Sequence, residues 1–188
     1  MSEVKFRRGF KSWSEQQAIT FRETLSIHPC APLPAVLLAR HLEVPIIDPT
    51  QVPAMSSEHL KQLLEIDAWS WSGVTVVFAE IMIIIKNPAH PPGRQQSDVM
   101  HELSHIICEH VAARVVQHPH LPLAQREYDT THEREAAWLG SCLQLPRSAL
   151  SWAVKRKMSH VEIAEHFGAT EDMVCYRRRM TGVDKTKL

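Results

Sequence analysis

Apolar residues recur at a spacing of three and four positions along most of the chain, the pattern of amphipathic helices. Capping residues, glycines and prolines divide these periodic stretches into separate segments. Ser12 and Glu15 have the spacing of a capping box before the first stretch, and Pro29, Pro32 and Pro34 follow it. The pattern predicts helices at residues 13–27, 35–42, 58–66, 94–116, 131–143, 147–155, 160–167 and 171–180.

A different pattern occupies the middle of the chain. Two runs rich in Val, Ile and Thr, residues 73–78 and 81–85, are separated by only two residues, as in a β-hairpin. Residues 44–47 form a shorter run with the character of an edge strand. The chain is therefore expected to be α+β and mostly helical, with one small sheet and helices around it.

The order of these elements indicates the domain organisation. A length of 188 residues suits one domain with a small appendage. Residues 1–145 contain the hairpin and the two long helices predicted at residues 94–116 and 131–143. Residues 146–188 contain three short helices, which are expected to form a helix-turn-helix-like subdomain packed on the first domain.

The charge balance disfavours two classes of function. The chain has 21 Lys and Arg against 21 Asp and Glu, and each half is separately neutral. Binding to nucleic acid or membranes through bulk charge needs a basic excess. The charged N-terminus is unlike a signal peptide, and the longest apolar run, residues 74–85, is too short to cross a bilayer. Four widely spaced cysteines have the usage of reduced thiols, so a cytoplasmic location is expected.

The count of twelve histidines raises the question of metal binding. His101-Glu102-Leu103-Ser104-His105 is an HExxH motif within the helix predicted for residues 94–116. Side chains four residues apart share one helix face, so both imidazoles can bind one Zn²⁺. Glu102 lies one position round, where it can take a proton from metal-bound water. The alternative is a chance match on a surface helix, but the apolar neighbours indicate a buried one.

A catalytic zinc site needs a third protein ligand. Glu109 and His110 are nearest, but we expect neither to bind. On a continuous helix Glu109 lies about 6 Å beyond His105 along the axis, and His110 points away from the shared face.

The next predicted helix offers His132, Glu133 and Glu135 as third ligands. Thr130 and Glu133 also have capping-box spacing, which would explain Glu133 without a metal. The spacing alone leaves the choice among the three open.

Two motifs taken together resemble the ImmA/IrrE family of metallo-endopeptidases. They are HELSHIICEH at residues 101–110 and EREAAWLGSCLQLP at residues 133–146, where the family has E-x-x-A-N-x-F-A-A-x-L-L-M-P. RGFKSWSEQQA near the start and NPAHPPGRQQSDVMHE before the motif extend the resemblance over nearly the whole chain. The resemblance implies a zincin-like metallopeptidase that cleaves a regulatory protein, often a helix-turn-helix repressor of a phage, mobile element or stress response.

Carried over by position, the resemblance implies that His101, His105 and Glu133 bind Zn²⁺ and that Glu102 is the general base. Zinc held in this way lowers the pKa of its bound water towards about 7. Glu102 would then accept the proton as the water attacks a peptide carbonyl, and pass it to the leaving amine.

The chain departs from the family pattern near these residues. Ser104 stands where Gly or Ala is common, Ala137 replaces a common Asn, and residues 139–141 read Leu-Gly-Ser instead of Phe-Ala-Ala. Gly140 costs its helix about 1 kcal/mol relative to alanine. These changes leave the catalytic set intact and affect the local packing and the substrate side.

Supporting roles are less well defined. Asp98 lies one turn before His101 and could orient a ligand, although an acidic residue near a helix N-terminus is common for other reasons. No single residue stands out as the group that stabilises the oxyanion, and a structural or surface role is the simpler reading of each candidate. The candidates are Tyr128, Tyr176, His118, His120 and His132.

The C-terminal helices raise the question of DNA binding. Residues 155–188 carry eight Lys and Arg against five Asp and Glu, and Ala164, Gly168 and Val174 have helix-turn-helix spacing. However, the second helix opens with two acidic residues, Glu171 and Asp172, and Arg177 stands where the motif normally buries an aliphatic side chain. Packing or protein recognition is therefore favoured over DNA binding.

The leading hypothesis is a cytoplasmic zinc endopeptidase. The alternative from another class is a regulatory or antitoxin-like protein that binds a partner protein or DNA without cleaving it. A pure binding protein has no need of Glu102, which favours the enzyme. A purely structural zinc site is disfavoured because three protein ligands leave one coordination position open.

Overall fold

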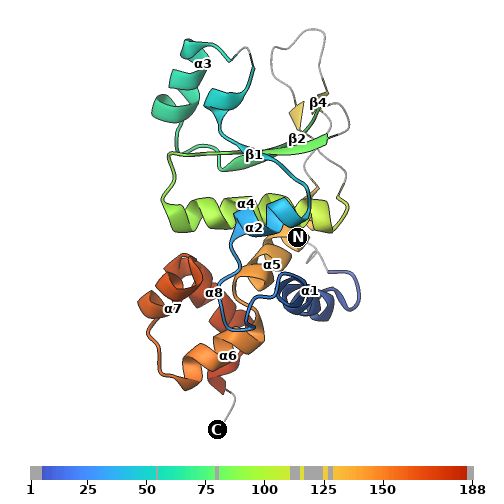
Figure 1. Ribbon diagram of the computed structural model, residues 1–188, viewed down its shortest axis with the longest axis vertical. Helices are drawn as coiled ribbons and strands as arrows, with labels where there is room; N and C mark the ends of the chain where they lie inside the picture. Colours follow the sequence, from blue (N-terminus) through green and yellow to red (C-terminus); the bar gives the residue numbers. More distant parts are fainter. Residues whose placement is uncertain are drawn as a thin grey trace.

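The computed structural model describes residues 6–53, 55–78, 81–110, 115–116, 125–126 and 129–185 (Figure 1). Within these residues the fold is α+β and mostly helical, as predicted. A small sheet lies in the upper half of Figure 1, and helix α4 (Pro92–Ile107) runs beneath it. The C-terminal helices form the lower part of the molecule.

The sheet is built on the predicted hairpin. Strands β2 (Gly73–Phe78) and β3 (Ile81–Lys86) pair antiparallel, with register from Gly73↔Lys86 to Phe78↔Ile81, which confirms the prediction. The strand order is β1-β3-β2, so β2 forms one edge of this sheet. Ile84 of the central strand is fully buried and joins the main core.

Two shorter pairings complete the strands. β1 (Ile46–Ile47) pairs in parallel with β3, within the segment predicted as an edge strand. β4 (Val115–Val116) and β5 (Gln125–Arg126) form a separate antiparallel ladder. The sequence pattern predicted that residues 115–116 end a helix, so this prediction was wrong.

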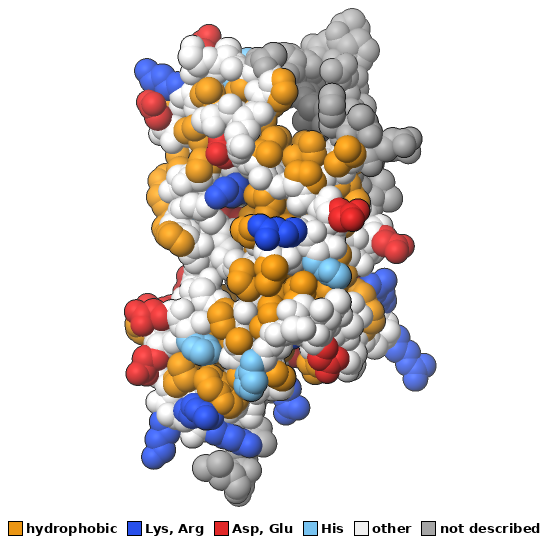
Figure 2. Space-filling view, viewed as in Figure 1, with side chains coloured by type: hydrophobic (Ala, Val, Ile, Leu, Met, Phe, Trp, Pro, Cys, Tyr) orange, Lys and Arg blue, Asp and Glu red, His pale blue; other side chains and the backbone are white. Residues whose placement is uncertain are grey.

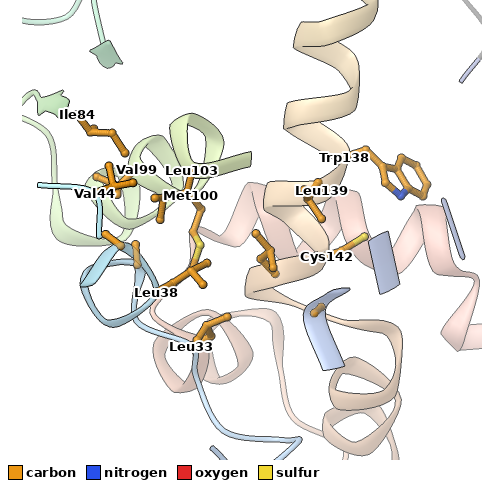
Figure 3. Close-up of a cluster of buried hydrophobic side chains, with 14 of the residues drawn as sticks. Leu33, Leu38, Val44, Ile84, Val99, Met100, Leu103, Trp138, Leu139 and Cys142 are labelled. Carbon is orange, nitrogen blue, oxygen red and sulfur yellow. The ribbon is translucent and has the colours of Figure 1, made fainter. Parts of the chain in front are cut away.

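Helices α1 (Phe10–Thr24), α2 (Ala35–His41), α4 and α5 (Thr130–Gln144) supply most of the main core. α5 packs against α4, and α1 packs against α5. α2 also contacts α4. Figure 3 shows their buried apolar side chains meeting between α4 and α5, which fixes the two motif-bearing helices relative to each other. The core includes Leu33, Leu38, Val99, Met100, Leu103, Leu139 and Leu143.

Helix α4 is shorter than predicted. It ends at Ile107, and Glu109 adopts the left-handed conformation with φ +56°. The backbone N–H of His110 donates to the carbonyl of His105 at 3.0 Å, and that of Glu109 to the carbonyl of Ile106 at 3.0 Å. This pair of hydrogen bonds is a Schellman motif, which turns the chain back over the last helical turn. The prediction of a continuous helix to residue 116 was therefore wrong.

Helix α1 begins earlier than predicted, at Phe10, after Gly9 with φ 81°. Ser12 lies inside the helix, so the predicted capping box does not form. Glu15 instead accepts a hydrogen bond from the backbone N–H of Arg147 at 2.8 Å. The predicted helix at residues 58–66 is also divided, into α3 (Ser57–Lys61) and the π-turn η2 (Gln62–Ile66).

The C-terminal helices occur where they were predicted. They are α6 (Arg147–Lys155), α7 (His160–Phe167) and α8 (Glu171–Thr181), followed by the 3₁₀ turn η3 (Val183–Lys185). They share an apolar cluster of their own, distinct from the main core. Its members include Leu145, Leu150, Ile163, Phe167 and Val174.

Arg177 joins α8 to the rest of the protein. Its guanidinium is fully buried, where Nη2 contacts Oε1 of Glu15 on α1. Nε donates to the carbonyl of Leu145 at 3.0 Å, and the guanidinium lies 5.7 Å from the ring centroid of Trp138 on α5. Arg177, the first of three consecutive arginines at residues 177–179, therefore faces the interior instead of solvent.

Three further features concern the surface charges, the polarity of the helices and the cysteines. Acidic and basic side chains are interspersed over the face in Figure 2, in keeping with the neutral composition. None of the helices within the described residues combines the length and apolar character needed to cross a bilayer. All four cysteines are free.

Candidate metal centre

Helix α4 brings His101 and His105 together on one face. Their side chains are one helical turn apart, and the two Nε2 atoms lie 3.1 Å from each other. The opposite face of α4 carries buried apolar residues, Val99 and Leu103 among them, that hold the helix in the core. The helix is therefore fixed with its two imidazoles directed at the first turn of α5.

Helix α5 supplies a carboxylate to the same point. Glu133 Oε2 lies 3.1 Å from Nε2 of His101, and Oε1 lies 3.6 Å from Nε2 of His105. The hydrogen bonds with these histidines hold the pKa of the Glu133 carboxyl well below its usual value. Of the three third-ligand candidates left open by the sequence, Glu133 is the one that meets both histidines.

The cap of α5 explains why Glu133 is available for this role. The N-cap is Asp129, whose side chain accepts hydrogen bonds from the backbone N–H groups of Thr131 and His132. Thr130 lies inside the helix, so the capping box considered for Thr130 and Glu133 does not form. Glu133 is consequently not the capping residue, and its carboxylate turns towards the histidines of α4.

The three side chains fit a zinc ion. Their donor atoms all lie within 4.8 Å of one another. Ligands on a tetrahedral zinc with bonds of about 2.0–2.1 Å are about 3.3 Å apart, close to the 3.1 and 3.6 Å separations among His101, His105 and Glu133. Two imidazoles and one carboxylate are also a donor set used by catalytic zinc, with one position left open.

Glu102 lies beside this cluster in a protected setting. Its side chain is on α4, and the residue is only 5% exposed. The hydroxyl of Thr75, on edge strand β2, donates to Oε2 of Glu102 at 2.6 Å. This contact fixes one oxygen of the carboxylate.

A pocket of about 590 Å³ opens next to His101, Glu102 and Glu133. Its walls come from the segment before β2, from α4 and α5, and from one residue of α8. The lining includes Trp69, Trp71, Gly73, Arg94, Gln144 and Met173. The C-terminal helices therefore contribute to the wall of the pocket.

Close packing of α4 against α5 depends on two of the departures from the family pattern. A Cβ at Gly140 would lie 3.2 Å from the carbonyl oxygen of Met100, 3.2 Å from Oγ of Ser104 and 3.4 Å from the backbone nitrogen of His101. Ser104 is buried, and its hydroxyl donates to the Met100 carbonyl at 2.6 Å. Gly140 thus allows α5 to lie against the backbone of the HExxH turn.

The proposed supporting residues lie elsewhere or engage other partners. Asp98 lines the pocket, but its carboxylate lies 2.6 Å from Nδ1 of His90 and 3.9 Å from Nε of Arg94. Tyr176 packs edge-on against Trp138, with ring centroids 6.4 Å apart, away from the pocket lining. Tyr128, His118 and His120 lie outside the described residues.

One residue at the site was missed by sequence reasoning. His110 was set aside because α4 was expected to continue, yet the Schellman turn places its Nδ1 3.1 Å from Nδ1 of His105. Nε2 of His110 lies 3.3 Å from Oε2 of Glu135, and burial lowers the pKa of His110 below its usual value. Neither glycine nor proline follows α4, so no local signal indicates this turn.

His132 also belongs to this neighbourhood. Its ring stacks on that of His110, with centroids 4.2 Å apart and an interplanar angle of 13°. It lies 3.7 Å from Asp129, the helix cap, and is not part of the group of metal-ligating atoms around Glu133. His132 therefore supports His110.

A paired-histidine helix, a glutamate on a second helix and a buried second glutamate in a pocket together form a candidate site of the metallopeptidase type. The comparison with protein families agrees. Residues 62–179, more than half of the chain, match the peptidase family described as the IrrE N-terminal-like domain. The chain belongs to this family, as its motifs indicated. Neither the curated proteins nor the solved structures gave a match.

Proposed function

We propose that the protein is a zinc-dependent endopeptidase with a zincin-like fold. The observation that carries the proposal is the convergence of His101, His105 and Glu133 from two helices beside the buried carboxylate of Glu102. Membership of a metallopeptidase family supports the same reading. His101, His105 and Glu133 would hold the ion through two imidazole nitrogens and one carboxylate oxygen.

A zinc ion bound there would polarise the scissile carbonyl and acidify the attacking water. Glu102 accepts the proton of that water and returns it to the leaving nitrogen as the peptide bond breaks. The hydroxyl of Thr75 holds Oε2 of Glu102 at 2.6 Å, so the carboxylate keeps one orientation through both transfers. The pocket beside it admits the substrate from one side of α4.

Edge strand β2 supports the binding of an extended peptide. Its first residue, Gly73, lines the pocket, and its third, Thr75, contacts Glu102. An edge strand has free backbone donors and acceptors along one side, to which an extended peptide can add by main-chain hydrogen bonds. A substrate bound in this way would pass Glu102 with its backbone aligned to the strand.

The proposed substrate is a regulatory protein, and a helix-turn-helix repressor is the candidate that the family resemblance implies. We further propose a division into a peptidase domain, residues 1–145, and a helical subdomain, residues 146–188, that packs on it. The buried Arg177 and the separate apolar cluster of α6 to α8 support this division. A packing role for these helices agrees with the inward orientation of Arg177.

Metal content and proteolysis test the proposal together. Purified protein is expected to hold about one zinc, which His101→Ala and Glu133→Ala remove and the exposed-site control His59→Ala retains. Glu102→Gln is expected to keep zinc but to lose cleavage of a proteome-derived peptide library and of a helix-turn-helix protein encoded beside it.

Each outcome has a defined meaning. Unchanged zinc in both ligand variants would overturn the metal centre. Cleavage by Glu102→Gln at the wild-type rate would overturn the role of the general base. Tight binding of the partner without cleavage by the zinc-loaded wild type would support the non-cleaving regulatory or antitoxin-like alternative.

A further inference from the structure

A chain of three side chains leads away from the proposed zinc site into the protein. His105 Nδ1 lies 3.1 Å from His110 Nδ1, and His110 Nε2 lies 3.3 Å from Glu135 Oε2. We propose that His110 and Glu135 are positioning residues that hold His105 in the orientation and tautomer required of a zinc ligand. The inference rests on the proposed zinc site and extends it beyond the ligands.

The burial of this chain indicates that it is a fixed structure. The side chains of His110 and Glu135 are 5% and 6% exposed. The ring of His132 stacks on His110, and Nε of Arg7 lies 3.6 Å from the other oxygen of Glu135. His110 and Glu135 therefore each have a second contact, and Oε2 of Glu135 is the oxygen that faces His110.

The backbone reinforces the first contact. The N–H of His110 donates to the carbonyl of His105 at 3.0 Å through the Schellman turn. Glu109 has φ +56° to make this turn, a conformation that costs a non-glycine residue free energy. The helix end thus places the His110 ring against the ring of the ligand.

Counting hydrogens along the chain gives a consistent set of tautomers. A neutral imidazole carries one N–H, so His105 must carry it on Nδ1 if Nε2 binds zinc. That N–H donates to Nδ1 of His110, which must then carry its own hydrogen on Nε2 and donate it to Glu135. Every contact in the chain then joins one donor to one acceptor.

The competing reading is a second metal site. Cys108, His110 and Glu135 have ligand atoms that all lie within 4.8 Å of one another. A metal on Nε2 of His110 would put the hydrogen of that ring on Nδ1, facing Nδ1 of His105. His105 would then carry its hydrogen on Nε2 and could not bind the first metal. The two metal sites require opposite tautomers of His105 and therefore exclude each other. We favour the site with Glu133 because it lies beside the pocket and the proposed general base.

Zinc affinity measured by competition with a chromophoric chelator tests the inference. His110→Phe keeps the ring but removes its nitrogens, and is expected to weaken zinc binding by about 10–100-fold. Glu135→Gln, an isosteric change, is expected to weaken it by about tenfold, the lower end of that range, because Glu135 acts through His110. His110→Asn keeps an acceptor near the Nδ1 position and is expected to recover part of the loss.

A matched control separates bonding from charge. Glu109→Gln removes a carboxylate from the same helix end, at an exposed position that takes no part in the contacts of His105, His110 and Glu135. It is expected to leave zinc affinity within about twofold of wild type. Equal effects of Glu109→Gln and Glu135→Gln would overturn the inference. Failure of the wild type to bind zinc would instead overturn the proposed function.

Nuclear magnetic resonance of the zinc-loaded wild type tests the tautomers without any substitution. Long-range nitrogen–proton spectra of the imidazoles are expected to show His105 protonated at Nδ1 and His110 at Nε2. The opposite tautomer of His110, or a second zinc equivalent lost in Cys108→Ser, would favour the second metal site and overturn the inference.

Discussion

Replacing Gly140 by alanine is expected to destabilise the protein, although alanine is the better helix former. The new methyl group would lie 3.2 Å from the Met100 carbonyl oxygen and 3.2 Å from Oγ of Ser104. Both neighbours belong to a buried helix and cannot move far. Overpacking of such a site costs about 1–3 kcal/mol, and helix propensity offsets about 1 kcal/mol. The free energy of unfolding is therefore expected to fall by about 1 kcal/mol.

The same substitution should disturb the metal centre. The methyl group would also approach the backbone nitrogen of His101 at 3.4 Å, while Glu133 lies on the helix that carries Gly140. Relief of the contact separates α5 from α4, and hence the carboxylate from the imidazoles. Zinc affinity is expected to fall about tenfold, in the range found for disturbed ligand support.

Urea unfolding of the zinc-free protein and chelator competition measure the two effects. Ala137→Gly, at an exposed position of the same helix, measures the contribution of helix propensity alone and should lower the free energy of unfolding by about 1 kcal/mol. Adding Ser104→Ala to Gly140→Ala removes one of the close contacts and should restore part of the stability. A Gly140→Ala protein that is more stable than wild type and binds zinc equally well would refute the packing argument.

Three other predictions concern charges and backbone conformation. The pKa of the Glu133 carboxyl is lower in the folded state than its usual 4.5. Its contribution to stability is therefore present above that pH and is lost as the pH falls. In zinc-free protein, Glu133→Gln should remove this part of the pH dependence of urea unfolding. Arg177→Met should lower the free energy of unfolding by about 3 kcal/mol, because it leaves the charge of Glu15 without its cation, and adding Glu15→Gln should restore part of the loss. Glu109→Gly should raise the melting temperature, with a gain of about 1 kcal/mol from relief of the left-handed conformation.

Local signals account for the parts of the fold that were predicted correctly. The hairpin follows from two β-rich runs with a two-residue connection, and α7 from the capping box of Ser159 and Glu162 and the left-handed Gly168. The HExxH motif is likewise a local pattern, since its geometry depends only on the helix that carries it. These features need no knowledge of the rest of the chain.

The features that were missed depend on contacts between distant segments. Glu15 was read as part of a cap, but it pairs with Arg177, which lies 162 positions further along the chain. The end of α4 has no breaker residue, so the position of His110 follows from its contacts with His105, His132 and Glu135. A sequence pattern indicates the local conformational preference of a segment, whereas the positions of these residues depend on contacts with other segments.

The placement of Met173 in the pocket wall has a consequence for the order in which the protein is made. Synthesis runs from the N-terminus, so the HExxH helix leaves the ribosome long before α8. Until residues 173 and 177 emerge, the pocket lacks the α8 residue of its lining and Glu15 lacks its arginine. The nascent chain would thus carry His101, His105 and Glu133 before the pocket beside them is complete.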